Sequence, residues 1–298
     1  GEFIERTIYS VLVQQYPALE YVVQDGASSD QTVDILTRFD PFLARCVSQP
    51  DEGQADAINR GFDGTTGGHR KFVTVLELLP VLAESRIMLL PGSLAYVARF
   101  FAEHPDVDVI YGNRIMVDEQ DRQIGVWILP RHDDRVLALA DFVPQETLFW
   151  RRTVWEAVGS RVDPDFEYAL DWDLLLRFRD VGARMVRLPR YLGAFRVHDE
   201  QKTTASHLLG LDECRRLLRR VHGHDPPPSE VNRGLTPYLL RHTLLHAWQR
   251  FFDVAAGPRS RVRTVPRDGC FGLGDGRFVS DALVETLHSE PPTRRITR

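Results

Sequence analysis

The first apolar residues of the chain recur with helical spacing. They stand at i, i+4, i+7 and i+8, which predicts an amphipathic helix over residues 3–13 that ends before Pro17. A short apolar run at 19–23 follows and favours a β-strand. The helical face consists of Ile4, Ile8, Val11 and Leu12. The chain is therefore expected to open with a helix and then a strand.

Helices and strands continue to alternate as far as residue 111. A polar turn at 25–30 provides the cap of a helix whose inner face is expected to carry Val33, Leu36 and Phe39. Further strands are expected at 45–48 and 107–111, and further helices at 54–62 and after Pro91, with Leu94, Val97, Ala98 and Phe101 facing inward. Alternation at this spacing predicts an α/β fold with a mostly parallel sheet between helices.

The second half of the chain is predicted to be mainly helical. Residues 115–117 and 124–127 flank a polar turn and predict a hairpin, and 191–195 has the composition of a strand. The helices are expected at 151–158, 171–181, 206–221 and 236–252. We therefore expect a sheet-containing domain over 1–205 and a helical extension over 206–256.

Both ends of the chain differ from this pattern. Periodicity fades after residue 256, so a loosely ordered tail is expected over 257–298. A stiff Pro-rich linker is expected at 225–229. Because the sheet begins with a helix rather than its first central strand, we expect the chain to be truncated at its N-terminus.

Composition places the chain among ordinary globular proteins and excludes several classes. Its 298 residues can bury a sizeable core, and a net charge of −5 gives no field that attracts nucleic acid. Cys46, Cys214 and Cys270 are too few and too widely spaced for a disulfide framework or a zinc site, which favours a reducing cytosol. Charges and a proline interrupt the apolar stretch at 73–90, so membrane attachment would be peripheral, at the inner surface.

Two acidic sites carry the candidate chemistry. Asp25 stands at the carboxyl end of a predicted strand, where open α/β sheets bind ligands, and Gly26 allows a ligand close to the backbone. A turn aspartate that satisfies loop amides is the structural alternative. Asp171 and Asp173 open an apolar helix, where a carboxylate acts as a helix cap or as a general base. The residues alone leave both alternatives open.

Several motifs in order resemble those of family 2 glycosyltransferases. Residues 10–32 resemble the string S-x-x-x-Q-x-Y-P … L-E-x-x-V-x-D-G-x-S-x-D-x-T, and 50–61 resemble D-x-G-x-x-D-A-x-N-x-G. The resemblance resumes in the segments Leu90-Pro-Gly92, Tyr111-Gly-Asn113, Gln145-Glu-Thr-Leu-Phe-Trp-Arg-Arg152, Leu170-Asp-Trp-Asp-Leu174 and Phe195-Arg-Val-His198. It covers about residues 1–205 apart from one gap.

The resemblance implies a GT-A fold with a Rossmann-like mixed sheet, and transfer of a sugar from a UDP-, GDP- or dTDP-sugar to an acceptor. It implies an inverting mechanism in which Asp171 is the general base, with Asp173 as a supporting cap. The implied donor-binding residues are Asp25, Gln54, Asp56, Asn59 and, against the diphosphate, Arg196. His198 would bind the metal, which the family implies to be Mg²⁺ or Mn²⁺.

The paired aspartates that bind this metal in the family are missing. Residues 64–105 contain no aspartate, and Glu77 and Glu84 are the candidate substitutes. Three explanations remain open: a divergent enzyme that uses Arg and Lys, an inactive nucleotide-sugar-binding homologue, and a local error in the translated sequence. A nucleotidyltransferase is a further alternative, since it shares a sheet with acidic strand ends.

The predicted partners are a nucleotide-sugar and a sugar or lipid-linked acceptor in cell-surface polysaccharide biosynthesis. A basic stripe on the predicted helix 206–221 predicts either contact with an anionic membrane or a solvated helix face. The stripe consists of Arg215, Arg216, Arg219 and Arg220.

Overall fold

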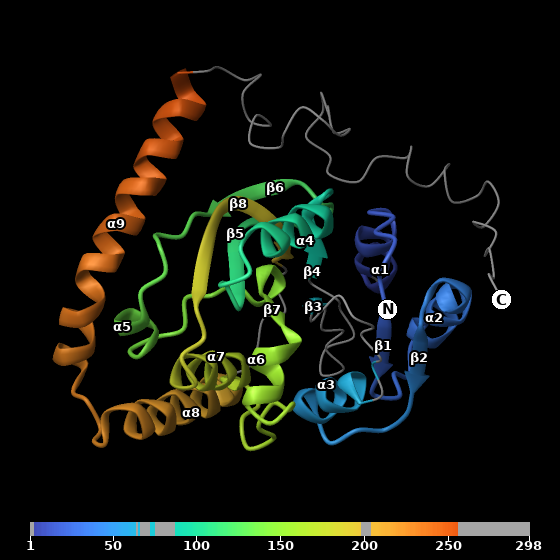
Figure 1. Ribbon diagram of the computed structural model, residues 1–298, viewed down its shortest axis with the longest axis horizontal. Coiled ribbons are helices and arrows are strands. Elements are labelled where there is room, and N and C mark those ends of the chain that lie inside the picture. The colour runs from blue at the N-terminus through green and yellow to red at the C-terminus, as the bar shows by residue number, and fades with distance from the viewer. Residues whose placement is uncertain (1–2, 64, 66–71, 75–86, 198–203, 256–298) are drawn as a thin grey trace.

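The computed structural model describes residues 3–63, 65, 72–74, 87–197 and 204–255. Within these ranges the chain forms an α/β fold with two sheets (Figure 1). The predicted tail over 257–298 lies outside the described residues.

The smaller sheet is parallel and contains the first predicted acidic strand end. Strand β1 (Val22–Asp25) pairs with β2 (Arg45–Ser48), with Asp25 opposite Ser48. Around these strands the chain forms α1 (Ile4–Leu12), α2 (Thr32–Phe39), the short 3-10 turn η1 (Asp40–Phe42) and α3 (Gln54–Phe62). Both strand ends thus reach the same edge.

The larger sheet has six strands in the order β3-β7-β5-β8-β4, with β6 paired to β5. Only β5 and β8 run parallel, and the other pairs are antiparallel. Its strands are β3 (Phe72–Thr74), β4 (Ile87–Leu89), β5 (Val109–Val117), β6 (Gln123–Trp127), β7 (Phe149–Arg151) and β8 (Met185–Arg196). The prediction of a mostly parallel sheet is wrong for this sheet, because strands far apart in the sequence pair in opposite directions.

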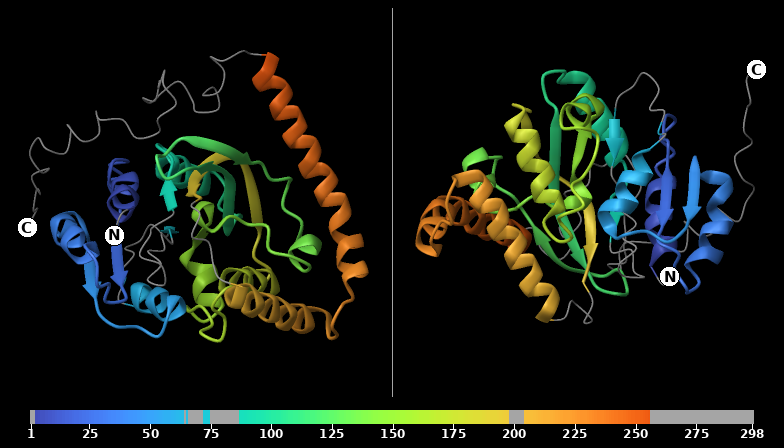
Figure 2. Two further views of the ribbon diagram at one scale, coloured as in Figure 1. Left: turned by 180° about the vertical axis from the view of Figure 1, so that it is seen from behind. Right: turned by 90° about the horizontal axis from the view of Figure 1, so that it is seen from below.

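The remaining elements cover this sheet and extend from it. They are α4 (Ser93–Glu103), α5 (Asp134–Leu137), η2 (Gln145–Thr147), α6 (Arg152–Ala157), α7 (Leu170–Asp180), α8 (Thr204–His222) and α9 (Pro228–Ala255). Helix α9 begins earlier than predicted, since Pro228 suits the first turn of a helix. The views agree that α8 and α9 lie at one end of the molecule and β1, β2 and α2 at the other (Figure 2).

Helical periodicity predicted most buried faces correctly. Ile4, Ile8 and Val11 of α1 are buried, as are Leu94, Val97 and Phe101 of α4. The prediction for Val33 is wrong: its side chain is exposed, and Ile35 lies in the core instead. Since α2 begins at Thr32, its inner face falls on the set Thr32, Ile35, Leu36 and Phe39.

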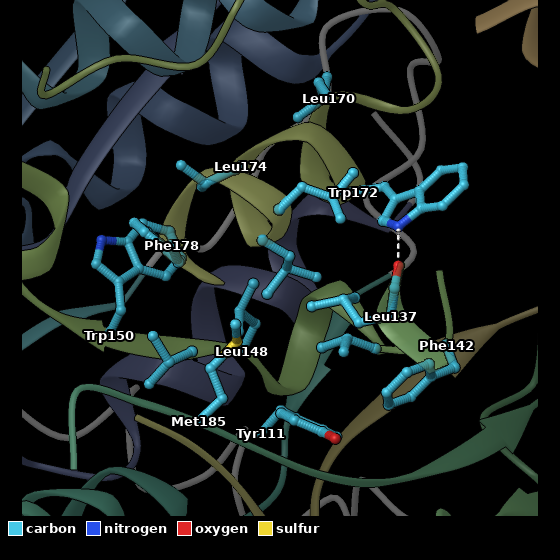
Figure 3. Packing of buried hydrophobic residues seen from close by; sticks show 14 of the residues in the cluster. Tyr111, Leu137, Phe142, Leu148, Trp150, Leu170, Trp172, Leu174, Phe178 and Met185 are labelled. Atoms are coloured by element: carbon cyan, nitrogen blue, oxygen red, sulfur yellow. Dashed lines mark hydrogen bonds between the residues drawn. The ribbon is translucent and has the colours of Figure 1, made fainter. Parts of the chain in front are cut away.

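The core around α7 sets the position of the second acidic site. Trp172 is buried among apolar residues, and its indole Nε1 donates a 2.8 Å hydrogen bond to the carbonyl oxygen of Leu137 (Figure 3). Helix α8 packs on the same cluster through Leu217, which is fully buried. Helix α8 therefore shares a core with α7, and the boundary at residue 205 stays a prediction.

In the parts of the chain that the structure describes, none of the helices combines the length and the apolar character that crossing a bilayer requires.

Candidate functional site

Asp25 ends β1 and connects the two strand ends of the small sheet. Its side chain accepts hydrogen bonds from the backbone N–H of Ser28 at 3.0 Å and from the hydroxyls of Ser28 and Ser48 at 2.5 and 2.6 Å. In the turn from Asp25 to Ser28, Ala27 has φ +64°, in the left-handed region that few non-glycine residues adopt. These contacts fix a nearly buried carboxylate at the edge where the resemblance implies a donor site.

Helix α3 carries three further predicted donor-binding residues, namely Gln54, Asp56 and Asn59. Asp56 pairs with Arg60 one turn later, with N–O distances of 2.9 and 2.7 Å, and accepts the N–H of Glu52 at 2.9 Å. An ion pair at this i, i+4 spacing is typical of an arginine on a helix surface.

Asn59 connects α3 to the loop that precedes α7. Its side-chain amide donates to the carbonyl oxygen of Val162 at 3.1 Å and accepts the N–H of the same residue at 2.9 Å. Both hydrogen bonds join segments about a hundred residues apart. Asn59 therefore ties the donor-side helix to the segment that leads to Asp171.

Asp171 lies in the first turn of α7 and is half-buried. Its Oδ1 accepts the backbone N–H of Trp172 at 2.9 Å. Two further carboxyl groups, Asp141 and Glu146, are close enough for the charge of Asp171 to raise their pKa values. The predicted base thus has two other carboxyl groups within electrostatic range.

Asp173 has a role other than the predicted one. Its carboxylate is fully buried and pairs with Arg177 Nε at 2.8 Å and with Arg220 Nη1 at 2.5 Å. The prediction that Asp173 caps the helix is wrong, because its oxygens bind these two guanidinium groups and α7 has no side-chain cap of its own at Ala169. Asp173 is a buried ion-pair partner.

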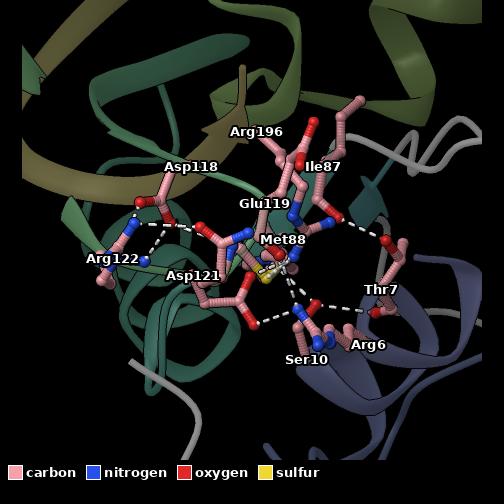
Figure 4. Close-up of polar contacts among 12 residues, drawn as sticks. Arg6, Thr7, Ser10, Ile87, Met88, Asp118, Glu119, Asp121, Arg122 and Arg196 are labelled. Atoms are coloured by element: carbon pink, nitrogen blue, oxygen red, sulfur yellow. Dashed lines mark hydrogen bonds and ion pairs between the residues drawn. The ribbon is translucent and has the colours of Figure 1, made fainter. Parts of the chain in front are cut away.

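Arg196 lies inside the molecule, between β8 and α1 (Figure 4). Its fully buried guanidinium pairs with Asp121 in the β5–β6 turn and stacks on the Phe3 ring at 4.2 Å. Arg6 joins the same carboxylate at 2.7 Å. This ion pair holds the hairpin against α1, and the diphosphate role of Arg196 stays a prediction.

The predicted metal ligands cannot be placed. His198, Glu77 and Glu84 lie outside the described residues. The described ranges contain no group of three or more His, Cys, Asp or Glu side chains that could hold a metal ion.

Glu146 and Asp141 are residues of this site that the sequence did not single out. Glu146 lies in a quoted motif without an assigned role; it is buried, with its Oε1 3.6 Å from Arg114 Nη1. Burial raises its pKa, which Arg114 counteracts. Asp141 is an exposed residue, yet close packing of protein around its carboxyl group and repulsion by Asp171 raise the pKa of that group. Their nearness to Asp171 depends on long-range packing.

Glu146→Gln is expected to stabilise the fold at neutral pH. A raised folded-state pKa means that the folded protein favours the protonated carboxyl, so wild-type stability falls as pH rises from the ordinary value of 4.5 through the folded value. Glutamine removes this cost. Melting temperatures measured from pH 4 to 8 should show a gain that is absent near pH 4 and full at pH 8.

Glu103→Gln on the exposed end of α4 is the matched control and should show no such gain. A Glu146→Gln variant less stable than wild type at pH 8 would contradict the assignment of the pKa.

Comparison with known proteins supports the relationship to glycosyltransferases. Residues 1–77 match the sequence model described as Glycosyl transferase family 2. A PGL/p-HBAD biosynthesis glycosyltransferase of Mycobacterium bovis (strain BCG / Pasteur 1173P2) is 31% identical over 171 residues, which are 56% of this chain and 61% of that protein. An uncharacterized glycosyltransferase of Nostoc sp. is 34% identical over 170 residues, 55% of this chain and 51% of that protein.

Solved structures share the fold. The chain resembles S. aureus TarS 1-349 in complex with UDP-GlcNAc, with a TM-score of 0.55 and 17% identity, over 80% of this chain and 68% of that chain. A TarS 1-349 complex with UDP gives a TM-score of 0.52 at 19% identity, over 79% of this chain and 66% of that one. The predicted GT-A-type α/β fold is confirmed, and the resemblance to family 2 is confirmed over residues 1–77. The chain spans about three fifths of the mycobacterial relative.

Proposed function

We propose that this chain transfers a sugar from a nucleotide-diphosphate sugar to an acceptor hydroxyl, with inversion at the sugar carbon. The observation that carries the proposal is the family 2 match over residues 1–77, which include Asp25 and α3, on a chain with the GT-A fold. The relatives carry glycosyltransferase names, and one structural neighbour holds UDP-GlcNAc. A UDP-, GDP- or dTDP-sugar is the donor class, and a sugar or lipid-linked alcohol in polysaccharide assembly is the acceptor class.

The proposed reaction is an in-line displacement. Asp171 takes the proton of the acceptor hydroxyl, and the hydroxyl oxygen of the acceptor bonds to the anomeric carbon of the donor sugar. The bond from that carbon to the diphosphate oxygen breaks on the opposite face, and the nucleoside diphosphate leaves with the electron pair. In this scheme Asp25 holds the nucleoside, and Asn59 ties α3 to the loop before Asp171.

The second candidate is an inactive homologue that binds nucleotide-sugars without turnover. The missing aspartates between residues 64 and 105 favour it. Release of labelled sugar from UDP-glucose, GDP-mannose and dTDP-glucose, to water or to an added acceptor, separates the two. Turnover of any of these donors supports the transferase, whereas binding without release supports the inactive homologue.

Membrane contact through the α8 arginines is a weaker part of the proposal. Arg216, Arg219 and Arg220 each pair with a carboxylate of the protein, namely Asp212, Asp225 and Asp173. These pairs favour a solvated helix face, whose arginines bind carboxylates of the protein, over a face that contacts an anionic membrane. A peripheral position at the inner membrane surface would then depend on the acceptor.

Asp25→Ala is expected to weaken donor binding more than Asp171→Ala does. Asp25 orders the strand-end loop and is assigned to the ground-state donor site, whereas Asp171 is assigned to proton transfer. Loss of a charged hydrogen-bond partner costs about 1.5–3 kcal/mol, or roughly 10- to 100-fold in affinity.

Calorimetric titration of UDP and UDP-glucose into both variants measures the difference. Ser48→Ala is the control that loses one hydrogen bond to Asp25 and should bind within a few-fold of wild type. Equal or reversed losses for the two aspartate variants would remove Asp25 from the donor site.

Turnover is expected to depend weakly on divalent metal. The segment 64–105 lacks aspartate, and a hard cation prefers several oxygen ligands, which one histidine cannot replace. Donor hydrolysis should therefore change less than about tenfold across a Mn²⁺ and Mg²⁺ series with EDTA controls. Strong, chelator-sensitive turnover would show that Glu77, Glu84 or another carboxylate has taken over the metal site.

A further inference from the structure

A carboxylate on α8 holds the turn that leads into helix α7. The residue before α7, Ala169, provides no side-chain hydrogen bond to the first turn. Instead, the carboxylate of Glu213 on α8 accepts the backbone N–H groups of Glu167, Tyr168 and Ala169 at 2.9, 2.8 and 2.9 Å. An anionic side chain from another helix thus accepts three N–H groups of the turn that leads into α7.

The same face of α8 also contacts α7 on the C-terminal side of Asp171, at Asp173. Arg220 follows Glu213 by seven residues, two helical turns, and its Nη1 lies 2.5 Å from Oδ1 of Asp173. Leu217 stands between them and is fully buried in the core shared with α7. Glu213, Leu217 and Arg220 therefore form one contact face against α7.

Asp171 lies between these two attachments. Glu213 fixes the backbone up to Ala169, and Arg220 fixes the side chain of Asp173 two residues beyond Asp171. Both carboxylates are buried and have partners. Glu213 accepts three backbone N–H groups, and Asp173 pairs with two guanidinium groups. Removal of Glu213 takes the carboxylate acceptor from three N–H groups, and removal of Arg220 takes one of the two guanidinium groups from the buried Asp173 beside the candidate base.

We propose that Glu213 and Arg220 are positioning residues, which set the place of Asp171 relative to the donor sugar from outside the predicted sheet-containing domain. The proposal rests on the proposed transferase function. Catalysis is sensitive to placement, since a shift of about 1 Å can cost roughly a hundredfold in rate. The two residues touch no reacting atom, so they act on kcat through α7 rather than on donor affinity.

The test uses the full chain with Glu213→Gln, Arg220→Met and Arg220→Lys. Arg219→Met is the matched control. Arg219 is an exposed neighbour of Arg220, and its ion pair in the described part of the chain is with Asp225 rather than with α7. The readouts are kcat and KM for hydrolysis of UDP-glucose, GDP-mannose and dTDP-glucose, and hydrogen exchange of the amides of residues 167–169.

We expect Glu213→Gln and Arg220→Met to lower kcat about tenfold or more with the donor KM within about twofold. Arg220→Lys should recover most of the rate, and Arg219→Met should match wild type. Faster exchange of the three amides is expected in Glu213→Gln. In an Asp171→Asn background Arg220→Met should lower kcat no further, because both changes then act through one missing base.

Unchanged kcat in Glu213→Gln and Arg220→Met, or a loss of equal size in Arg219→Met, would overturn this inference and leave the proposed transferase function standing. Additive losses in the double variant would do the same. If Glu213→Gln or Arg220→Met fails to fold, the other variant decides: a folded chain with a lower kcat at constant donor KM supports the inference, and a folded chain with wild-type kcat overturns it. A wild-type chain that turns over none of the donors would defeat the proposed function and, with it, this inference.

Discussion

Asp171→Asn is expected to lower kcat by about 10²- to 10⁴-fold and to leave nucleotide-sugar affinity within about twofold. Asparagine keeps the shape of the side chain and can still accept the N–H of Trp172, but it cannot take a proton from the acceptor. The measurement is steady-state transfer with each donor, paired with calorimetric titration of UDP. A variant that keeps wild-type turnover would remove Asp171 from the mechanism.

Asp173→Asn is expected to lower stability, with a loss of kcat no larger than that of Arg220→Met because it weakens the same contact. The carboxylate is fully buried between Arg177 and Arg220, whose side chains are 23% and 41% exposed. Loss of its charge leaves two guanidinium groups uncompensated, which costs about 3 kcal/mol, at the low end for a broken buried pair because the arginines reach solvent. The melting temperature should fall by about 6–12 °C.

Asp180→Asn at the other end of α7 is the matched control. Asp180 pairs with Arg179 on the surface, so the same substitution should change stability by less than about 1 kcal/mol. If Asp173→Asn melted like wild type but lost turnover, the roles of Asp171 and Asp173 would be exchanged.

Local elements were predictable from the sequence because local periodicity determines them. The spacing at 54–62 gave α3 with its observed bounds, and the apolar positions after Pro91 gave the buried face of α4. In α2 the predicted Leu36 and Phe39 are buried, and Val33 was misplaced because the first turn of that face is filled by Thr32 and Ile35. The antiparallel pairs of the large sheet join strands that no short-range pattern connects.

The candidate site was predictable only in part. Strand-end position and family resemblance pointed to Asp25 and Asp171. The contacts of Glu213, Arg220 and Asn59 span 44 to 103 residues, and a basic stripe on a helix carries no sign of the carboxylate that it pairs with. Asp141 and Glu146 were missed for the same reason, although the quoted motif at 145–152 contained Glu146.

The central claim, donor binding at the β1 strand end, is tested most directly by thermal unfolding with nucleotide-sugars. At a hundred times its dissociation constant a donor adds about 2.7 kcal/mol, or about 5–10 °C in melting temperature. The account predicts that at least one of UDP-glucose, UDP-GlcNAc, GDP-mannose and dTDP-glucose stabilises the wild type to this extent and Asp25→Ala much less. No stabilisation of the wild type by any of them, or equal stabilisation of both chains, would contradict it.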